Sequence, residues 1–459
     1  MLTLAACACA ATPAASPLRI VKLGDRLALP EAREHLQFAR DHGFEALWVY
    51  AGTAATWWPP ERPLALAPDF LELARLAEAS GMRVMVSINP VGDSLGAFRF
   101  SDRAHVRRVR ELVHKLAREA DVREFVLAFD DQPTRLEELD DILRFGRSAA
   151  PAHLDLARRA ADWVPRSARL WLCASADADA PLGDGTGPYA ARFLEGVRQL
   201  PAGIGIVWTG PDVVSPAILA ADLAKTRARL GGRRLLLYDN YPVNDDGAGL
   251  GLALVLGPLR GRDPAIVNQI EAYLACPMTQ LGGSRLALAT VAAFLADPAA
   301  YDPETSWTAA QHDLAGEDPA TRAALRVQAL EWGGFVGDRN YRPAWIDNVE
   351  VAAARLDEPA FVASWSWVAA RYPARMADLA RLADRPFRND LLDAMARRLA
   401  VARAVPLAAE YRARISAGRR DLEDLLAALA REIASWDTRS SARRALVDFL
   451  EAADVPRHP

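Results

Sequence analysis

Residues 123–133 read R-E-F-V-L-A-F-D-D-Q-P, an apolar run that ends on two adjacent carboxylates. The run from 125 to 129 has no polar alternation, which is typical of a parallel strand covered on both faces. Pro133 cannot donate a backbone hydrogen bond and restricts the residue before it, so we expect the strand to end here. Asp130 and Asp131 then lie at the C-terminal end of a strand, where α/β barrels build their active sites.

Asp130 and Asp131 are the candidate catalytic residues. Two adjacent acids repel each other, and such a pair can separate its pKa values into an acid role and a base role. An alternative is a helix N-cap, because Asp is common before a helix such as the one predicted for residues 136–145. A cap accounts for one Asp and leaves the other without a role, so we favour chemistry.

The chain on both sides of this stretch repeats the same pattern, in which short apolar runs alternate with longer amphipathic segments. The predicted strands are residues 19–23, 46–50, 83–89, 123–130, 169–173, 203–209, 233–239 and 270–276. The predicted helices between them include residues 30–42, 70–79, 102–118, 151–163, 190–200 and 216–230. Eight such units predict a (β/α)₈ barrel. A doubly wound sheet is the alternative. However, residues 22–25, K-L-G-D, which follow the first strand, contain too few glycines for the Gly-rich dinucleotide-binding motif.

Strand-like runs disappear after about residue 306, and Ala, Leu, Arg and Glu dominate the rest of the chain. The predicted helices there are residues 321–332, 359–369, 376–383, 390–405, 422–435 and 440–453. No heptad register persists, which disfavours a coiled coil. The sequence therefore predicts three regions: a leader at 1–17, an α/β barrel at 18–305 and an all-helical domain at 306–459.

Composition excludes several classes of partner. The 459 residues are 51% hydrophobic and 25% charged, with a net charge of -4. This balance does not provide the concentrated basic surface that nucleic-acid binding needs, so we expect no nucleic-acid partner. The four cysteines have no spacing typical of a zinc site or a disulfide framework, so we expect no metal and no cofactor. No apolar stretch is long enough to span a membrane.

The N-terminus resembles the end of a bacterial lipoprotein signal, in which Leu4-Ala5-Ala6-Cys7 would be the lipobox. Only six residues precede Cys7, fewer than a secretory signal needs, so an Ala-rich leader is the alternative. The first interpretation predicts a secreted or periplasmic protein that contacts the membrane only through a lipid on Cys7.

Polar and aromatic residues also follow other predicted strands. Trp208 ends the sixth strand, where its ring could pack on a sugar, although a core aromatic is an equally good interpretation. The seventh strand leads into Y-D-N-Y-P-V-N-D at residues 238–245, and the eighth ends at Cys276. If the barrel is correct, these residues converge with Asp130 and Asp131.

Five segments together resemble glycoside hydrolase family 84, the β-N-acetylglucosaminidases that include O-GlcNAcases. They are F-D-D at 129–131, P-A-H-L-D-L-A-R-R at 151–159, W-T-G-P-D-V-V-S at 208–215, Y-D-N-Y-P-V-N-D at 238–245 and A-D-P-A-A-Y-D-P-E-T-S-W at 296–307. The resemblance implies a barrel hydrolase that acts on a carbohydrate or glycoconjugate.

The resemblance also implies a retaining, substrate-assisted mechanism, in which the 2-acetamido oxygen attacks the anomeric carbon and forms an oxazoline. Asp130 would hold the acetamido N–H, and Asp131 would protonate the leaving oxygen and then activate water. Asn240 and Asp245 match positions that hydrogen-bond the sugar. The predicted substrate-binding set is completed by Trp208, Tyr238 and Cys276.

Three positions depart from the family pattern. Residues 50–53, Y-A-G-T, lack the sugar-binding Lys; Cys276 replaces an Asn; and residues 173–177, C-A-S-A-D, lack a Tyr. These changes suggest two alternative functions: a barrel that binds sugar without catalytic activity, and a barrel hydrolase with another carbohydrate specificity. A hydrolase whose second carboxylate comes from Glu124, Asp177 or Asp239 is a further alternative. The sequence does not specify the aglycone or the oligomeric state.

Overall fold

The computed structural model describes residues 16–24, 28–90, 97–244, 253–333, 349–437 and 440–455. Two residues named above, Cys7 and Asp245, lie outside these ranges, so the lipid anchor and the role of Asp245 stay predictions. In the described residues, every helix is too short or too polar to span a bilayer.

Eight parallel strands within the described ranges close into a barrel, which confirms the predicted fold class. Around the barrel the order is β1-β10-β9-β8-β7-β6-β5-β2. The bounds are β1 Leu18–Lys22, β2 Ala46–Tyr50, β5 Arg83–Ile88, β6 Glu124–Ala128, β7 Arg169–Cys173, β8 Ile204–Trp208, β9 Leu235–Pro242 and β10 Ala272–Cys276. Each of the eight predicted strands overlaps one of these.

Most residues of the barrel strands are buried, as their largely apolar sequences require. All five residues of β6 are buried, and β6 pairs in parallel with β5 and with β7. The register places Ala128 opposite Cys173, so the C-terminal ends of β6 and β7 lie side by side. The loops that leave these two strands therefore begin at adjacent points of the barrel rim.

The helices between the strands are amphipathic, and α4 (Arg103–Glu119) illustrates why they form. The side chain of Asp102 accepts a hydrogen bond from the N–H of Ala104 at 2.7 Å and caps the helix. Apolar residues then recur at helical spacing and are buried: Val106, Val109, Leu112, Val113 and Leu116. The other helices of this kind are α1 Leu29–Asp41, α3 Pro68–Ala79, α6 Ala150–Trp163, α8 Pro188–Val197, α9 Ala220–Arg229 and α10 Arg285–Ala296.

Short elements that the sequence did not predict lie in the loops. They are α2 Ala51–Ala54, β3 Ala55–Thr56, β4 Ala65–Leu66, α7 Asp179–Leu182 and the 3₁₀ helix η1 Pro264–Gln269. The helix predicted for 136–145 is shorter than expected, because α5 spans only Leu139–Phe145.

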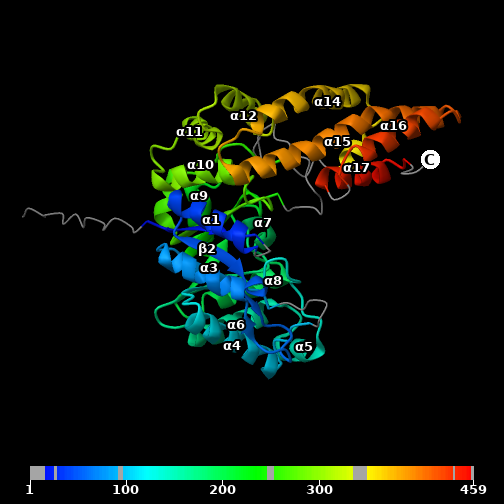
Figure 1. Ribbon diagram of the computed structural model, residues 1–459. Helices are drawn as coiled ribbons and strands as arrows, with labels where there is room; N and C mark the ends of the chain where they lie inside the picture. The colour runs from blue at the N-terminus through cyan, green and yellow to red at the C-terminus, as the bar shows by residue number, and fades with distance from the viewer. Residues whose placement is uncertain are drawn as a thin grey trace, which may run out of the picture. The chain divides into compact units, whose positions relative to one another are not determined.

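The chain divides into two compact units. The first includes Phe44–Asp239 and Gly261–Leu274, and the second includes Val21–Gly43, Asn240–Arg260 and Ala275–Pro459. The second unit contains a series of helices that can be followed in Figure 1. Their bounds are α11 Pro303–Ala315, α12 Pro319–Glu331, α13 Val349–Ala354, α14 Pro359–Leu379, α15 Arg385–Ser416, α16 Glu423–Ala434 and α17 Ser441–Ala452.

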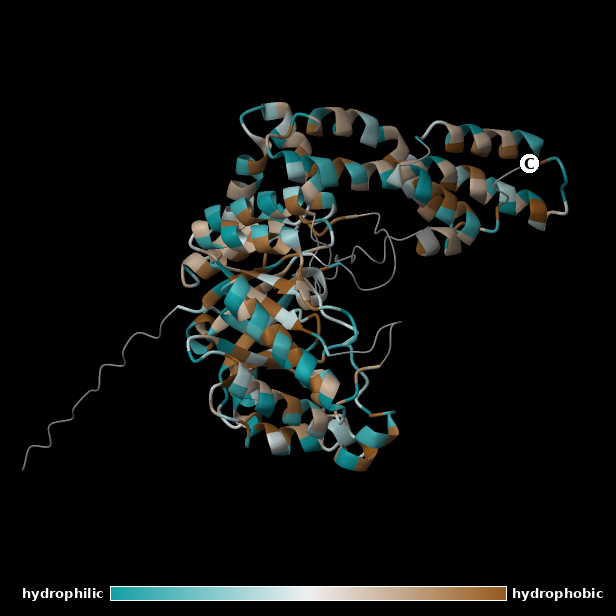
Figure 2. Ribbon diagram, turned by 60° about the horizontal axis from the view of Figure 1, so that its bottom comes forward, coloured by the Kyte–Doolittle hydropathy of each residue, from teal (hydrophilic) through white to brown (hydrophobic). Residues whose placement is uncertain are grey.

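Two helix boundaries in the second unit were predicted wrongly, both at prolines. The helix predicted for 390–405 continues through Pro406, because α15 spans Arg385–Ser416. The helices predicted for 359–369 and 376–383 imply a break at Pro373, but α14 runs through it as one helix. An interior proline costs about 3 kcal/mol because it removes a hydrogen bond. Burial of neighbours such as Trp365 and Tyr372 offsets this cost, since α14 and α15 lie side by side (Figure 1). Figure 2 shows polar and apolar residues mixed along these helices, as amphipathic packing requires.

Candidate active site

The chain leaves the barrel between Phe129 and Asp130. Phe129 is fully buried, and its N–H donates to the carbonyl of Cys173 at 3.0 Å, which extends the contact between β6 and β7. Asp130 is half-buried and Asp131 is exposed. The predicted pair of carboxylates therefore lies at the C-terminal rim of the barrel.

A tight turn fixes Asp131 directly after the strand. Its φ is 59°, in the left-handed region that Asp tolerates better than most residues, and the N–H of Gln132 donates to the carbonyl of Phe129 at 3.1 Å. The next helix, α5, begins at Leu139, and Glu138 occupies its N-cap position. Neither Asp130 nor Asp131 caps that helix, so the alternative N-cap interpretation is wrong.

Asn89, which follows β5, faces the Asp130 carboxylate. The hydroxyl of Ser87 donates to the amide oxygen of Asn89 at 3.0 Å, so the amide nitrogen points the other way. That nitrogen lies 3.5 Å from Oδ1 of Asp130. Ser87 is fully buried and orients Asn89 as a hydrogen-bond donor to Asp130.

Asp177 supplies a third carboxyl group beside the pair. It follows β7 by four residues and is half-buried. Burial, and then the negative charge of Asp130, raise the pKa of Asp177 to about 7, and Asp131 adds to this. The sequence offered Asp177 only as an alternative, because nothing in its neighbours indicates how deeply it would be buried.

The turn after β8 holds the backbone of Asp177 in place. The N–H of Thr209 donates to the carbonyl of Asp177 at 2.9 Å. Gly210 has φ of 119°, and a Cβ at this position would lie 2.3 Å from Oγ of Ser215. Ser215 in turn closes the turn through two hydrogen bonds with the backbone of Asp212. The W-T-G-P-D-V-V-S segment thus serves to position the β7 loop.

A network of buried side chains connects the residues that follow β6 with those that follow β7. The ring of His153, on α6, stacks on Phe129 with centroids 3.8 Å apart. Burial lowers the pKa of His153 to about 3, so the ring is neutral and its Nδ1 accepts from the hydroxyl of Tyr189 at 3.1 Å. The same hydroxyl accepts from the N–H of Ser175 at 3.1 Å. Sequence reasoning missed this network, although His153 lies in the 151–159 segment.

Glu124 and Asp239 have structural partners and cannot serve as the second carboxylate. Glu124 begins β6, so about 20 Å of extended chain separates it from Asp130. It is 1% exposed and accepts from Arg169 at 2.7 Å and from the indole of Trp171 at 3.1 Å.

Asp239 is buried in an equivalent way within β9. Both of its carboxylate oxygens accept from Arg262, at 2.8 and 2.6 Å, and Tyr273 also donates to it. Of the three alternative carboxylates, the structure therefore leaves only Asp177 near the pair.

The two predicted aromatic residues are largely buried. Trp208 ends β8 with 1% of its surface exposed, which favours the core interpretation over a sugar platform. Its indole N–H is among the buried donors without a partner in the described residues. Tyr238, within β9, contacts the edge of Trp48 with centroids 5.5 Å apart.

Asn240 and Cys276 belong to the second unit and are described within it. Asn240 is half-buried in β9, and Cys276 ends β10 with 1% of its surface exposed. Four residues after Asn240, the amide of Asn244 donates to Gln280 at 2.9 Å and accepts from the N–H of Thr279 at 3.0 Å. Asn244 thereby ties together the chain segments that follow β9 and β10.

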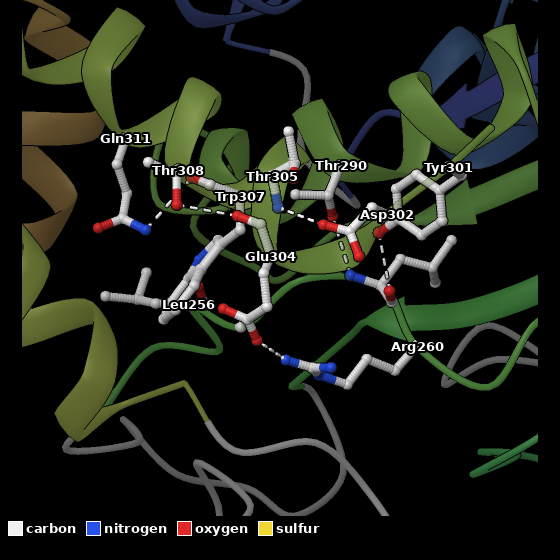
Figure 3. Close-up of polar contacts among 12 residues, drawn as sticks. Leu256, Arg260, Thr290, Tyr301, Asp302, Glu304, Thr305, Trp307, Thr308 and Gln311 are labelled. Atoms are coloured by element: carbon white, nitrogen blue, oxygen red, sulfur yellow. Dashed lines mark hydrogen bonds and ion pairs between the residues drawn. The ribbon is translucent and has the colours of Figure 1, made fainter.

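The 296–307 segment has a structural role, which Figure 3 shows. The hydroxyl of Tyr301 donates to the carbonyl of Leu259, and the indole of Trp307 donates to the carbonyl of Leu256, both at 2.7 Å. Asp302 caps α11 by accepting from the N–H of Thr305 at 2.8 Å. This segment therefore fastens the chain at 256–259 and carries no reacting group.

In the described ranges, no group of three or more His, Cys, Asp or Glu side chains is placed to hold a metal ion. The arrangement instead brings together carboxyl groups and an amide donor, which can transfer protons and stabilise a positive charge.

Comparison with a family model described as NAGidase, beta-N-acetylglucosaminidase, gives a match over residues 35–329. The match covers more than half of the chain and includes Asp130, Asp131 and Asp177.

The solved structures that share the fold include the following two. A variant of the Thermobaculum terrenum O-GlcNAc hydrolase superposes with a TM-score of 0.62 at 19% identity, covering 95% of this chain and 94% of that one. The protein named CpGH84B gives a TM-score of 0.60 at 17% identity, covering 97% of this chain and 74% of that one. At these identities the likeness concerns the fold.

Proposed function

The chain belongs to the beta-N-acetylglucosaminidase family and is a glycoside hydrolase, and from this premise we propose that it releases terminal β-linked N-acetylglucosamine, or a related 2-acetamido sugar, with retention of configuration. One observation carries the proposal. Asp130 and Asp131 follow a fully buried strand, and neither is used to cap the next helix.

The first step forms a protonated oxazoline, an oxazolinium ion, from the substrate itself. The acetamido oxygen attacks the anomeric carbon while the bond to the leaving oxygen breaks, and Asp131 transfers its proton to that oxygen. Asp130 stays ionised, accepts the acetamido N–H and stabilises the positive charge that develops on the ring. The exposure of Asp131 suits a group that must reach the leaving side of the sugar.

The second step reverses the roles. Asp131, now a carboxylate, takes a proton from water as the water oxygen attacks the anomeric carbon, and the oxazoline opens to regenerate the acetamido group. The amide of Asn89 supports Asp130 in both steps, because a donor to the carboxylate favours its ionised form.

Asp177 has the role of a neutral neighbour. Its pKa of about 7 in the free protein means that it holds a proton at acidic pH and is about half protonated at neutral pH. A bound sugar excludes water from the site and strengthens the burial that raises this pKa, so binding favours the protonated form. The neutral carboxyl can donate a hydrogen bond and leaves Asp130 free to act as the single ionised group beside the 2-substituent.

The second candidate function is sugar binding without turnover. It is favoured by Cys276, a buried thiol where the family pattern has an Asn, and by residues 50–53, which carry no Lys. A buried polar contact contributes about 1–3 kcal/mol, so the loss of several weakens sugar binding without removing the carboxylates.

Hydrolysis of a chromogenic aryl N-acetyl-β-glucosaminide by the full chain distinguishes these functions. We expect turnover, and we expect Asp130→Asn to lose most of it. Asp131→Asn should lose most of its activity on an alkyl glycoside, whose leaving oxygen needs a proton, while Asp140→Asn, on an exposed face of α5, keeps full activity. Calorimetric binding of N-acetylglucosamine without any turnover at high protein concentration would support the second function. Full activity in both site variants would point to another hydrolase mechanism.

A further inference from the structure

A hairpin between β2 and α3 forms the wall of a pocket beside the candidate active site. β3 pairs antiparallel with β4, and the chain between them carries Trp57 and Trp58. We name this cavity the hairpin pocket; its volume is about 430 Å³. Its lining includes Tyr50, Thr56, Trp57, Trp58, Arg62 and Asn89.

The hairpin pocket is built from packed side chains and a pinned backbone. The guanidinium of Arg108, on α4, is buried and donates to the carbonyl of Arg62 at 2.7 Å and to that of Pro60. Trp58 packs edge-on against His105, with centroids 4.8 Å apart, and lies 5.8 Å from Trp57. The cavity is therefore preformed and needs little ordering when a ligand binds.

The chemistry of the lining suits a sugar ring. Tyr50 is half-buried and offers aromatic surface for the apolar face of a pyranose, while Trp57 and Trp58 are buried and form the wall of the cavity. Thr56 and Asn89 add a hydroxyl and an amide, which can donate to or accept from sugar hydroxyls.

Arg62 gives the hairpin pocket a positive charge at its rim. Its side chain is exposed, and no carboxylate of the described residues pairs with it. Glu61 does not line the pocket, and its charge instead acts on His105. A guanidinium without a partner favours an anionic group, which it can bind through two parallel hydrogen bonds.

Asn89 connects the hairpin pocket to the reaction site. It lines the pocket, and its amide nitrogen also faces Oδ1 of Asp130 at 3.5 Å. A sugar bound at Asp130 and a ligand in the pocket would thus be separated by one side chain. This spacing fits two adjoining units of one oligosaccharide.

We propose that the hairpin pocket is a subsite for a second sugar unit that carries a carboxylate or sulfate group and is linked to the 2-acetamido sugar at Asp130. Tyr50 receives its ring and Arg62 pairs with its anionic group. This assignment rests on the proposed function, because it takes Asp130 as part of the sugar site. The substrate class is then an acidic oligosaccharide that contains N-acetylglucosamine.

Direct binding to the full chain tests the proposal without requiring turnover. Calorimetry would compare N,N′-diacetylchitobiose with disaccharides that join N-acetylglucosamine to glucuronic acid in either order, and with a 6-sulfated chitobiose. We expect an acidic disaccharide to bind at least tenfold more tightly than the neutral one at low salt. Arg62→Gln should abolish that preference, and Arg75→Gln, an exposed arginine on α3, should keep it.

Each outcome has a distinct meaning. Preference for the carboxylate or for the sulfate identifies which anion the subsite takes, and either supports the proposal. Equal binding of neutral and acidic disaccharides, or a preference that survives Arg62→Gln, overturns it. Absence of hydrolysis of the aryl glycoside would overturn the proposed function alone, because the binding preference is measured separately.

Discussion

Two parts of the barrel rim are held in different ways. At β6 and β7, Asp130 and Asp177 lie in front of a buried network in which His153 stacks on Phe129 and bonds to Tyr189. At β2, the chain departs into the short α2 and a two-stranded hairpin that together surround the hairpin pocket. The first region is fixed from within the barrel, and the second by a local insertion.

This difference indicates how one fold can keep its chemistry and change its substrate. A carboxyl group that transfers protons must be held within a narrow range of positions, and a buried network supplies that restraint. A loop outside the barrel can be exchanged at little cost to the core. The region at β6 and β7 would then determine the reaction, and the hairpin would determine which glycan reaches it.

The strongest test of the β6 region replaces its carboxylates one at a time. Asp131→Ala should lower kcat/KM by about 10²–10⁴ for alkyl glycosides, which need a proton on the leaving oxygen, and spare activated aryl glycosides. Asp130→Ala should slow both kinds of substrate, because acetamido attack is needed in each. A plot of rate against leaving-group pKa measures the difference.

The role of Asp131 as proton donor would be contradicted if Asp131→Ala slowed alkyl and activated aryl glycosides equally. Asp131 would then position another group and would not itself transfer the proton. The control is Asp140→Asn, which should leave the plot unchanged because Asp140 is exposed on α5.

A smaller effect is expected from pH. Asp177 has a raised pKa of about 7 in the free protein and binds sugar in its protonated form, so kcat/KM should fall above pH 7, by about tenfold per pH unit. The charges of Asp130 and Asp131, beyond β6, raise the pKa of Asp177, and the charge of Asp177 in turn raises the pKa of Cys173 on β7 and of Tyr189 on α8. An activated aryl glycoside is used because its leaving group needs no proton from Asp131. With this substrate, kcat should stay constant over the same pH range.

Asp177→Asn should remove this alkaline limb, because the amide keeps a donor and cannot ionise. A fall above pH 7 that persists in Asp177→Asn, or that appears equally in kcat, would show that another group titrates. A merely structural role for Asp177 would change the rate at every pH and leave the shape of the profile intact.

The smallest effect concerns the network behind the rim. Tyr189→Phe removes the hydroxyl that joins His153 to Ser175 and should lower the free energy of unfolding by about 1–3 kcal/mol. Tyr411→Phe, on α15, should change stability by less than about 0.5 kcal/mol, because no hydrogen bond of its hydroxyl is found in the described residues. Thermal unfolding measures both, and equal shifts would contradict the restraint ascribed to this network.

The strands were predictable because they combine apolar runs with clear ends. The predicted 46–50 and 169–173 match β2 and β7 residue for residue, since each is bounded by polar or small residues. Asp130 and Asp131 were predictable because Pro133 marks the end of their strand. Pro373 misled the prediction, because packing on α15 offsets the hydrogen bond that the proline removes.

Burial and partners could not be read from the sequence. Trp208 ends a strand as predicted, but its depth in the core depends on residues far away in the chain. The rise in the pKa of Asp177 requires Asp130, which is 47 positions earlier and becomes a neighbour only through the pairing of β6 with β7. The hairpin pocket depends in the same way on Arg108 from α4.

The central claim is that the substrate's own acetamido oxygen attacks the anomeric carbon beside Asp130. The most direct test is kcat for aryl glycosides whose acetamido group carries zero, one, two or three fluorines. Fluorine makes the carbonyl oxygen a weaker nucleophile, so the account predicts a steady fall in kcat with each substitution. A kcat that does not change across the series, or equal cleavage of a glucoside without an acetamido group, would contradict it.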